Sequence, residues 1–241
     1  MAKDILIEKV YQELRNYVLD NQQQGRIKIN QNVLAKHLGV SRTPVVKALH
    51  MLESDGMVDN IPNRGFFIHV PTLRELCELF ALRQSFEMVA SSYVCQYATE
   101  EELKNLESLF QPFVGKESID YDEYFAADKQ FHRMVFDLCG NRLMHRINDQ
   151  MRVMERSFSI GLFRQPKETL NEHIEMAKAF RAGDEARAQE LVFMHMDITR
   201  RYLENLQRQL KALGLDPDLV SAKDVTFRNR VDVKNGDHMS L

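Results

Sequence analysis

Two short helical patterns joined by a tight turn occupy residues 33–54, and they restrict the fold more than any other feature of the sequence. Gly39 ends the first pattern, because glycine adopts the positive φ of a helix C-terminus without strain. Ser41 is suited to cap the second helix, and Pro44 is tolerated in a first helical turn. The spacing predicts a helix-turn-helix whose second helix runs to about residue 54 and buries one apolar stripe, Val45, Leu49 and Leu52.

The charge pattern around this helix-turn-helix favours a nucleic-acid partner. No acidic residue lies between Asp20 and Glu53, whereas Arg26, Lys28, Lys36, Arg42 and Lys47 are all cationic. A surface that faces phosphates needs such a one-sided positive field. We therefore expect DNA contacts from the helix-turn-helix residues Lys36, Ser41, Arg42, Thr43, Val46 and Lys47.

Residues 57–70 predict two short strands about a turn at residues 62–65, of sequence Pro-Asn-Arg-Gly. Arg64 would lie at the tip of this turn beside Gly65, where it is suited to contact the DNA backbone or minor groove. A helix over residues 5–20 is expected to brace the helix-turn-helix. Residues 1–70 thus predict a winged helix-turn-helix DNA-binding domain; the alternative is a small helical domain with a hairpin and no ligand.

The chain from Thr72 onward shows helical patterns, and we expect six helices there: 72–98, 99–114, 119–139, 141–163, 167–182 and 184–211. Their short connections favour an antiparallel bundle over residues 72–213. The polar residues 214–241 are expected to form a largely flexible tail. The predicted fold class is therefore mainly α: an N-terminal winged helix-turn-helix with a small β-wing, followed by an antiparallel all-helical bundle.

Cysteine usage and hydropathy indicate the compartment. Cys77, Cys95 and Cys139 are widely spaced within apolar helical patterns, which favours reduced core thiols over disulfides or a thiolate metal site. No apolar run approaches the roughly 20 residues that cross a bilayer, and the N-terminus lacks the apolar core of a signal peptide. We expect a cytoplasmic protein without a membrane segment.

Four polar residues interrupt apolar faces of the predicted bundle. Asp128 and His132 are four residues apart on one helix, so both side chains point the same way. His173 and His195 lie on the inward faces of two later helices. One carboxylate and three imidazoles from three helices predict a site for a divalent transition metal such as zinc, nickel, iron or manganese. The alternative for each histidine is a hydrogen-bonded core residue.

Arg83 breaks the apolar stripe of the first bundle helix, and a guanidinium directed into a bundle needs an anionic partner. Two partners remain open: Glu87, one turn away, or the carboxylate of a small organic acid that also binds the metal. Arg83 is therefore the candidate effector-binding residue. Arg152 and Arg156 are weaker candidates for binding an acid, and a solvated face is the favoured expectation for both. The opposite stripe of the same helix is also apolar, so this helix is either central or partly buried against a second subunit.

These motifs together resemble the GntR superfamily of bacterial transcription regulators, in the branch with the FadR-type C-terminal (FCD) ligand-binding domain. The resemblance extends to about residue 211 and rests on residues 34–45, residues 62–65, and Arg83, Asp128, His132, His173 and His195. It implies a homodimer that reads a pseudo-palindromic operator, with an effector that changes its DNA affinity. The Asp/His set matches the metal ligands of the family, and Arg83 matches a position that often helps to hold the effector. Six bundle helices resemble the VanR-type subgroup.

The sequence departs from the family pattern at two places. The arginine and glutamate that usually follow Pro-Val are replaced by Val46 and Lys47. Valine offers only apolar contact to a base, whereas lysine reaches guanine or phosphate, so base readout is expected to differ. The customary Pro-Gly turn before Val33 is also absent, and residues 25–30 read Gly-Arg-Ile-Lys-Ile-Asn instead.

The function best supported by the sequence is a ligand-responsive transcriptional regulator, of the kind that usually acts as a repressor in this family. No catalytic residue is assigned, because no further inward carboxylate or other base stands beside the expected metal ligands. Two alternatives remain open. A metal-dependent hydrolase would use the Asp/His set to activate water, and a metal sensor would respond to the ion itself.

Overall fold

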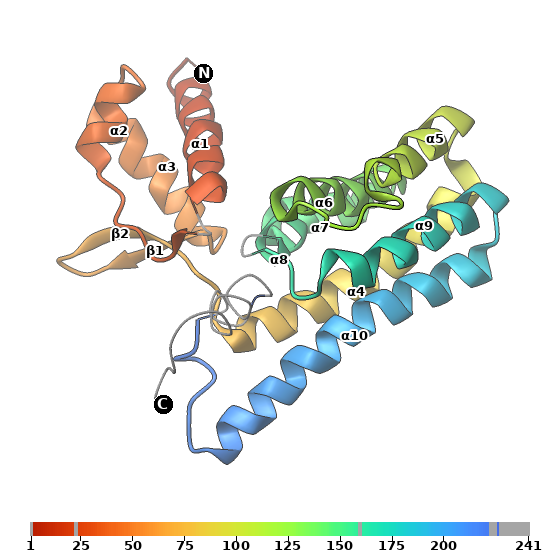
Figure 1. Cartoon of the computed structure of the whole chain (residues 1–241). Helices are drawn as coiled ribbons and strands as arrows, with labels where there is room; N and C mark the ends of the chain where they lie inside the picture. Colours follow the sequence, from red (N-terminus) through yellow and green to blue (C-terminus); the bar gives the residue numbers. More distant parts are fainter. Residues whose placement is uncertain (1, 22–23, 159–160, 222–225, 227–241) are drawn as a thin grey trace.

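The computed structural model describes residues 2–21, 24–158, 161–221 and 226 of the chain. Figure 1 shows a small N-terminal unit of helices and a hairpin beside a larger helical bundle. The prediction of a mainly α fold with a winged N-terminal unit is confirmed. Within the described residues, no helix is both long and apolar enough to cross a membrane.

The N-terminal unit consists of α1 (Ala2–Asn21), α2 (Gln31–His37) and α3 (Arg42–Ser54), with α1 packed across α3. The predicted inward stripe of α3 is confirmed, because Val45, Leu49 and Leu52 are all buried. They belong to a core to which all three helices and the hairpin contribute, and its other members include Leu14, Val18, Leu34, Met57 and Ile68. Ser41 occupies the N-cap of α3, but its hydroxyl makes no capping hydrogen bond, contrary to expectation.

The wing is an antiparallel hairpin of β1 (Val58–Ile61) and β2 (Gly65–Ile68), as predicted. Its turn requires left-handed backbone at Asn63 (φ 61°) and Gly65 (φ 92°), conformations that asparagine and glycine tolerate best. The segment before α2 adds a third extended stretch to this sheet. The amide of Ile29 donates to the carbonyl of Phe66, and the amide of Ile68 donates to that of Ile27, both at 2.8 Å.

The bundle begins with α4 (Leu73–Tyr97) and ends with α10 (Glu185–Ala212), which lie side by side along their length (Figure 1). The two helices run antiparallel, because Gln96 near the end of α4 donates to Glu185 at the start of α10. The elements between them are α5 (Glu100–Ser108), a 3-10 turn η2 (Gln111–Phe113), α6 (Tyr121–Leu138), α7 (Arg142–Met151), α8 (Val153–Ser157) and α9 (Pro166–Ala182).

One predicted helix, residues 141–163, is wrong. The chain leaves the helical path at Arg152, whose φ of 52° and ψ of 36° are left-handed, and the short α8 then starts in a new direction. The side-chain oxygen of Asn148 accepts a hydrogen bond from the amide of Met154 at 3.0 Å and so stabilises the break. The described part of the bundle therefore holds seven α-helices rather than six, and the helix count does not favour the VanR-type subgroup.

The chain after α10 returns to the start of α4. The amide of Leu73 donates to the carbonyl of Val220 at 3.1 Å, and Thr72 pairs with Ser221 as an isolated bridge. Arg74 donates through Nε to Asp218 at 2.6 Å. Residues 214–221 thus pack at the junction between the two units, whereas most of the expected tail lies outside the described residues.

Candidate DNA interface and metal centre

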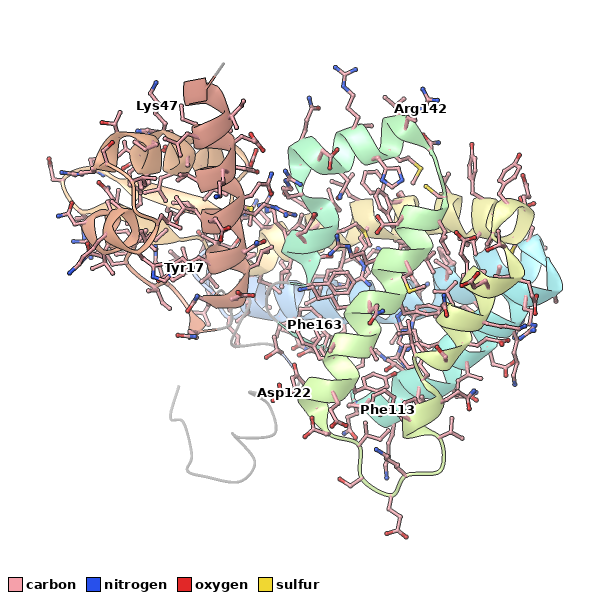
Figure 2. The ribbon with its side chains drawn as sticks, turned by 90° about the horizontal axis from the view of Figure 1, so that it is seen from above. Tyr17, Lys47, Phe113, Asp122, Arg142 and Phe163 are labelled. Atoms are coloured by element: carbon pink, nitrogen blue, oxygen red, sulfur yellow. The ribbon has the colours of Figure 1, made fainter. Side chains whose placement is uncertain are left out.

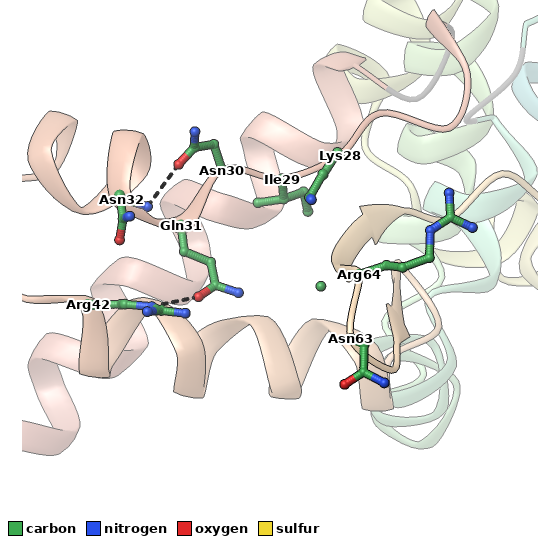
Figure 3. Close-up of a pocket in the computed structure, with 9 residues that line it drawn as sticks. Lys28, Ile29, Asn30, Gln31, Asn32, Arg42, Asn63 and Arg64 are labelled. Carbon is green, nitrogen blue, oxygen red and sulfur yellow. Dashed lines mark hydrogen bonds between the residues drawn. The ribbon is translucent and has the colours of Figure 1, made fainter.

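The residues assigned to DNA contact lie on the accessible face of the N-terminal unit. Lys36, Ser41, Arg42, Thr43, Lys47 and Arg64 are exposed, and Val46 and Gly65 are partly exposed. A hollow of about 590 Å³ lies between the start of α3 and the wing (Figure 3). Three cations from separate segments line it, Lys28, Arg42 and Arg64.

Hydrogen bonding positions Arg42 at this hollow, because its Nε donates to Oε1 of Gln31 at 2.8 Å (Figure 3). The guanidinium of Arg64 lies 5.6 Å from the ring centre of Phe67, which favours a cation–π contact. Lys28 and Gln31 were not among the predicted contact residues. Lys28 reaches the hollow because its segment pairs with β2, and no local periodicity in the sequence indicates that pairing.

The three histidines predicted as ligands converge inside the bundle. His132 on α6, His173 on α9 and His195 on α10 are all buried, and one potential ligand atom from each lies within 4.8 Å of the others. The Nε2 atoms of His132 and His173 are 3.2 Å apart. Three helices that are distant in sequence thus direct imidazoles at one point.

Asp128, the fourth predicted ligand, lies at the edge of this cluster. Its Oδ1 is 3.3 Å from Nε2 of His173 and 3.9 Å from Nε2 of His132. Its side chain is nearly buried, so its charge is poorly solvated and needs a partner. The carboxylate therefore faces the same point as two of the imidazoles.

Each imidazole is oriented through its other nitrogen. Nδ1 of His132 lies 2.5 Å from Oε2 of Glu87, and Nδ1 of His195 lies 2.7 Å from Oε2 of Glu172. Nδ1 of His173 lies 3.0 Å from the hydroxyl of Tyr124. Carboxylate and hydroxyl partners of this kind are typical of histidines that bind metals, because they fix the ring and its tautomer.

The protonation states suit such a role. Burial lowers the pKa of His132, and it lowers the pKa of His173 well below the ordinary value, so both rings are held neutral. Burial raises the pKa of Glu87, but the charge of Arg83 and the hydrogen bonds from Arg83 and His132 outweigh it and bring that pKa to about 2. Because an ionised carboxylate only accepts hydrogen bonds, Nδ1 of His132 carries the hydrogen and Nε2 presents its lone pair.

Arg83 has the first of its two predicted partners. Its Nε donates to Oε1 of Glu87 at 2.5 Å, and both side chains are buried. The guanidinium also stacks on Phe158, with Cζ 3.9 Å from the ring centre. Arg83 nevertheless lines the small cavity beside the histidines, so its position permits contact with a ligand there.

A second arginine in the cavity wall was not predicted. Arg164 follows α8 in sequence, and both its terminal nitrogens donate to Glu172 at 2.7 Å, the carboxylate that orients His195. Arg164 lies between two predicted helices, 141–163 and 167–182, so helical periodicity does not indicate that its side chain faces the bundle. The centre therefore contains two linked sets, Arg83–Glu87–His132 and Arg164–Glu172–His195.

The α8 helix connects this centre to the N-terminal unit. Figure 2, in which the molecule is viewed from above, shows α1 beside this part of the bundle. Arg152 donates through Nη2 to the hydroxyl of Tyr11 at 3.1 Å, and that hydroxyl donates to Asp55 at 2.5 Å. Arg15 of α1 donates to Glu155 at 2.7 Å. The expectation of a solvated face is therefore wrong for Arg152.

Arg156 also belongs to this contact rather than to a solvated face. A Cβ atom at Gly56 would lie 3.2 Å from Cζ of Arg156, so the guanidinium packs directly on the glycine backbone. Nη2 of Arg156 lies 3.7 Å from Oε1 of Glu75. The side chain of Arg156 on α8 thus contacts both the turn after α3 and the start of α4.

The sequence of this chain matches two families of known proteins over most of its length. The FCD domain family matches residues 78–198, and the family of bacterial regulatory proteins named gntR matches residues 6–68. The HTH-type transcriptional regulator YdhC of Bacillus subtilis (strain 168) is 25% identical over 207 residues, which are 83% of this chain and 92% of the relative. The HTH-type transcriptional repressor RspR of Escherichia coli (strain K12) is 20% identical over 78% of this chain and 85% of its own.

Solved structures show the same fold. A GntR transcriptional regulator from Rhodococcus sp. RHA1 has a TM-score of 0.67 at 20% identity and covers 83% of this chain and 97% of its own. E. coli McbR/YncC has a TM-score of 0.62 at 19% identity, over 83% of this chain and 98% of its own. The matched families and relatives are transcriptional regulators, which confirms that the chain is not an enzyme and leaves the hydrolase alternative without support. This chain belongs to the GntR family of DNA-binding transcriptional regulators and carries an FCD domain.

Proposed function

We propose that this regulator holds a divalent transition metal between Asp128, His132, His173 and His195, and that a small carboxylate effector bound there changes its affinity for operator DNA. The observation that carries the proposal is the convergence of three buried imidazoles whose Nδ1 atoms are all engaged. We assign zinc, nickel, iron and manganese as the candidate ions, because imidazole and carboxylate ligands suit all four.

The spacing of the donor atoms fits a metal. Two nitrogens that each lie about 2.0–2.1 Å from a tetrahedral ion are about 3.3 Å apart. The Nε2 atoms of His132 and His173 are 3.2 Å apart, and Oδ1 of Asp128 is 3.3 Å from the second of them. With the hydrogen of His173 on Nδ1, which faces Tyr124, a cation between these atoms would receive lone pairs from both Nε2 atoms and from Oδ1 of Asp128.

The proposed route from effector to DNA passes through Phe158. This ring lines the cavity beside the histidines and also a cleft of about 570 Å³ between α1 and the helices α6 and α7. The cavity measures only about 40 Å³, so a ligand that enters it must press on its walls. Displacement of Phe158 would move α8, whose N-cap residue Arg152 and whose Glu155 hold α1.

The DNA contacts proposed for Lys36, Ser41, Arg42, Thr43, Val46, Lys47, Arg64 and Gly65 rest on their exposure and on the cationic hollow between α3 and the wing. A homodimer would present two such surfaces to a pseudo-palindromic operator. Exposed apolar side chains on the adjacent helices α4 and α10 offer a surface for the second copy: Leu82 and Val89, each 44% exposed, and Phe193 and Ile198, 41% and 45% exposed.

The Arg42→Ala variant is expected to bind operator DNA about 1–3 kcal/mol more weakly if Arg42 reads a base. If the guanidinium contacts phosphate instead, the loss will be similar for all sequences and the salt dependence will become shallower. An electrophoretic shift assay at fixed salt measures both. Lys104→Ala, an exposed cation of the bundle, serves as the control, and unchanged binding of Arg42→Ala would contradict the assignment.

To test the effector proposal, the affinity of the metal-loaded protein for operator DNA is measured with and without a small carboxylic acid. We expect the acid to change affinity about 5–150-fold, the range typical of allosteric coupling. In the Phe158→Ala variant, calorimetry should still detect binding of the acid, but the acid should change the affinity for operator DNA less than it does in the parent protein. Leu106→Ala removes a buried side chain elsewhere in the core and controls for the loss of packing. An acid effect that persists in full would rule out the route through Phe158.

The same titration separates the metal-sensor alternative. If metal and chelator alone switch operator affinity without acid, the ion itself is the effector. Native mass spectrometry of these samples reports the metal and whether two chains bind each operator.

A further inference from the structure

The charges around the histidines limit the kind of acid that this centre can take. We propose that the effector is a small monocarboxylic acid of two or three carbons, and that dicarboxylic and tricarboxylic acids are excluded. This inference rests on the metal-centred function proposed above and names its ligand class. It follows from the charge balance and from the size of the cavity.

The two arginines at the cavity are already neutralised. Arg83 donates to Glu87 at 2.5 Å, and Arg164 donates to Glu172 through two bonds of 2.7 Å. Each carboxylate also accepts from an imidazole, which fixes it in place. Neither arginine is therefore available as an uncommitted cation for a second carboxylate.

Asp128 is then the one remaining full charge among the described residues that line the cavity, since the imidazoles are neutral when they bind a metal. Glu168 lies 3.8 Å from Nε of Arg164, but half of its side chain is exposed and water screens it. With a divalent ion the centre has a net charge of about +1, which one carboxylate balances.

A ligand of any other charge leaves an unpaired charge in a buried site. A dicarboxylate would bring a second anion with no cation to receive it, and an uncharged analogue would leave the excess positive charge unpaired. Burial of an uncompensated charge is strongly unfavourable. The centre therefore discriminates by charge as well as by the presence of a carboxylate.

The walls also limit the size of the ligand. Four apolar side chains line the cavity of about 40 Å³: Phe80, Phe158, Leu162 and Phe163. A water-sized group needs about 10–15 Å³ of such volume, so the cavity holds roughly three. A carboxylate with one or two further carbons therefore needs only the displacement of Phe158 proposed above, whereas a larger acid would also have to displace the other aromatic walls.

Three molecules with the same number of carbons test the charge rule: propanoate, propanamide and malonate. Isothermal titration of the metal-loaded full-length protein should show propanoate binding at least about tenfold more tightly than either of the others. Glu172→Gln keeps an oxygen for His195 but removes one negative charge, so this variant should gain affinity for malonate relative to propanoate. Glu175→Gln, an exposed carboxylate on the same helix, should keep the wild-type order.

The outcomes separate this inference from the function on which it rests. Metal content by native mass spectrometry is measured first, and a protein that takes up no metal overturns the proposed function. If metal binds and malonate or citrate binds as tightly as propanoate, the charge rule is overturned while the carboxylate effector stands. If metal binds and no acid binds, both the effector and the charge rule are overturned.

Discussion

Replacing Glu87 with alanine is expected to lower the free energy of unfolding by about 3–5 kcal/mol, because it leaves a buried guanidinium without its counter-ion. Arg83 is 4% exposed and Glu87 is 1% exposed, so water cannot take the place of the carboxylate. The substitution also removes the partner of Nδ1 of His132. Urea denaturation of the metal-free protein measures the loss.

Two further variants show whether the loss comes from the stranded charge. Glu101→Ala removes an exposed glutamate and should change stability by no more than about 0.5 kcal/mol. The double variant Arg83→Met and Glu87→Leu removes both charges and should recover much of the stability, because apolar pairs often replace buried ion pairs well. A single Glu87→Ala variant that loses less than about 1 kcal/mol would mean that Arg83 finds another anion.

Substitution of His173 by alanine is expected to weaken metal binding by roughly 100-fold or more. Zinc sites with four protein ligands bind with about 10–16 kcal/mol, so each ligand accounts for about 3 kcal/mol. His173 is fully buried and lies close to both Asp128 and His132, so no other described side chain takes its place. Competition with a chromophoric chelator gives the affinity.

His145→Ala provides the matched control for this substitution, because His145 is a bundle histidine that contacts Phe136 rather than the cluster. It should retain the metal affinity of the parent protein. Metal should also raise the melting temperature of the parent and of His145→Ala but not that of His173→Ala. Equal metal content in all three proteins would show that the cluster is not the binding site.

Local pattern was sufficient to predict the winged helix-turn-helix. The stripe on α3 and the turn at Asn63 and Gly65 depend on neighbours within a few residues, and both appear as predicted. The break at Arg152 does not depend on a glycine or proline, so no local pattern predicts it. It depends on a hydrogen bond from Met154 to Asn148 and on contacts with Tyr11 in another part of the chain.

The histidine cluster was predictable because helical periodicity places each side chain on an inward face. On α10 the buried neighbours of His195 are Val192 and Thr199, whereas Ile198 is 45% exposed. The orienting partners were not predictable as a set. Glu87 lies 45 residues from His132, and Glu172 lies 23 residues from His195, so only the packing of helices brings them together.

The return of the chain from α10 to Thr72 and Leu73 has a practical consequence for taking the regulator apart. A truncated chain that stops at Leu213 would lose the carbonyl that receives the amide of Leu73 and the carboxylate that pairs with Arg74. The helical domain expressed alone should therefore extend to Ser221. Since its first and last described segments adjoin, the same domain is a suitable scaffold for circular permutation, with new ends placed in the loop between η2 and α6.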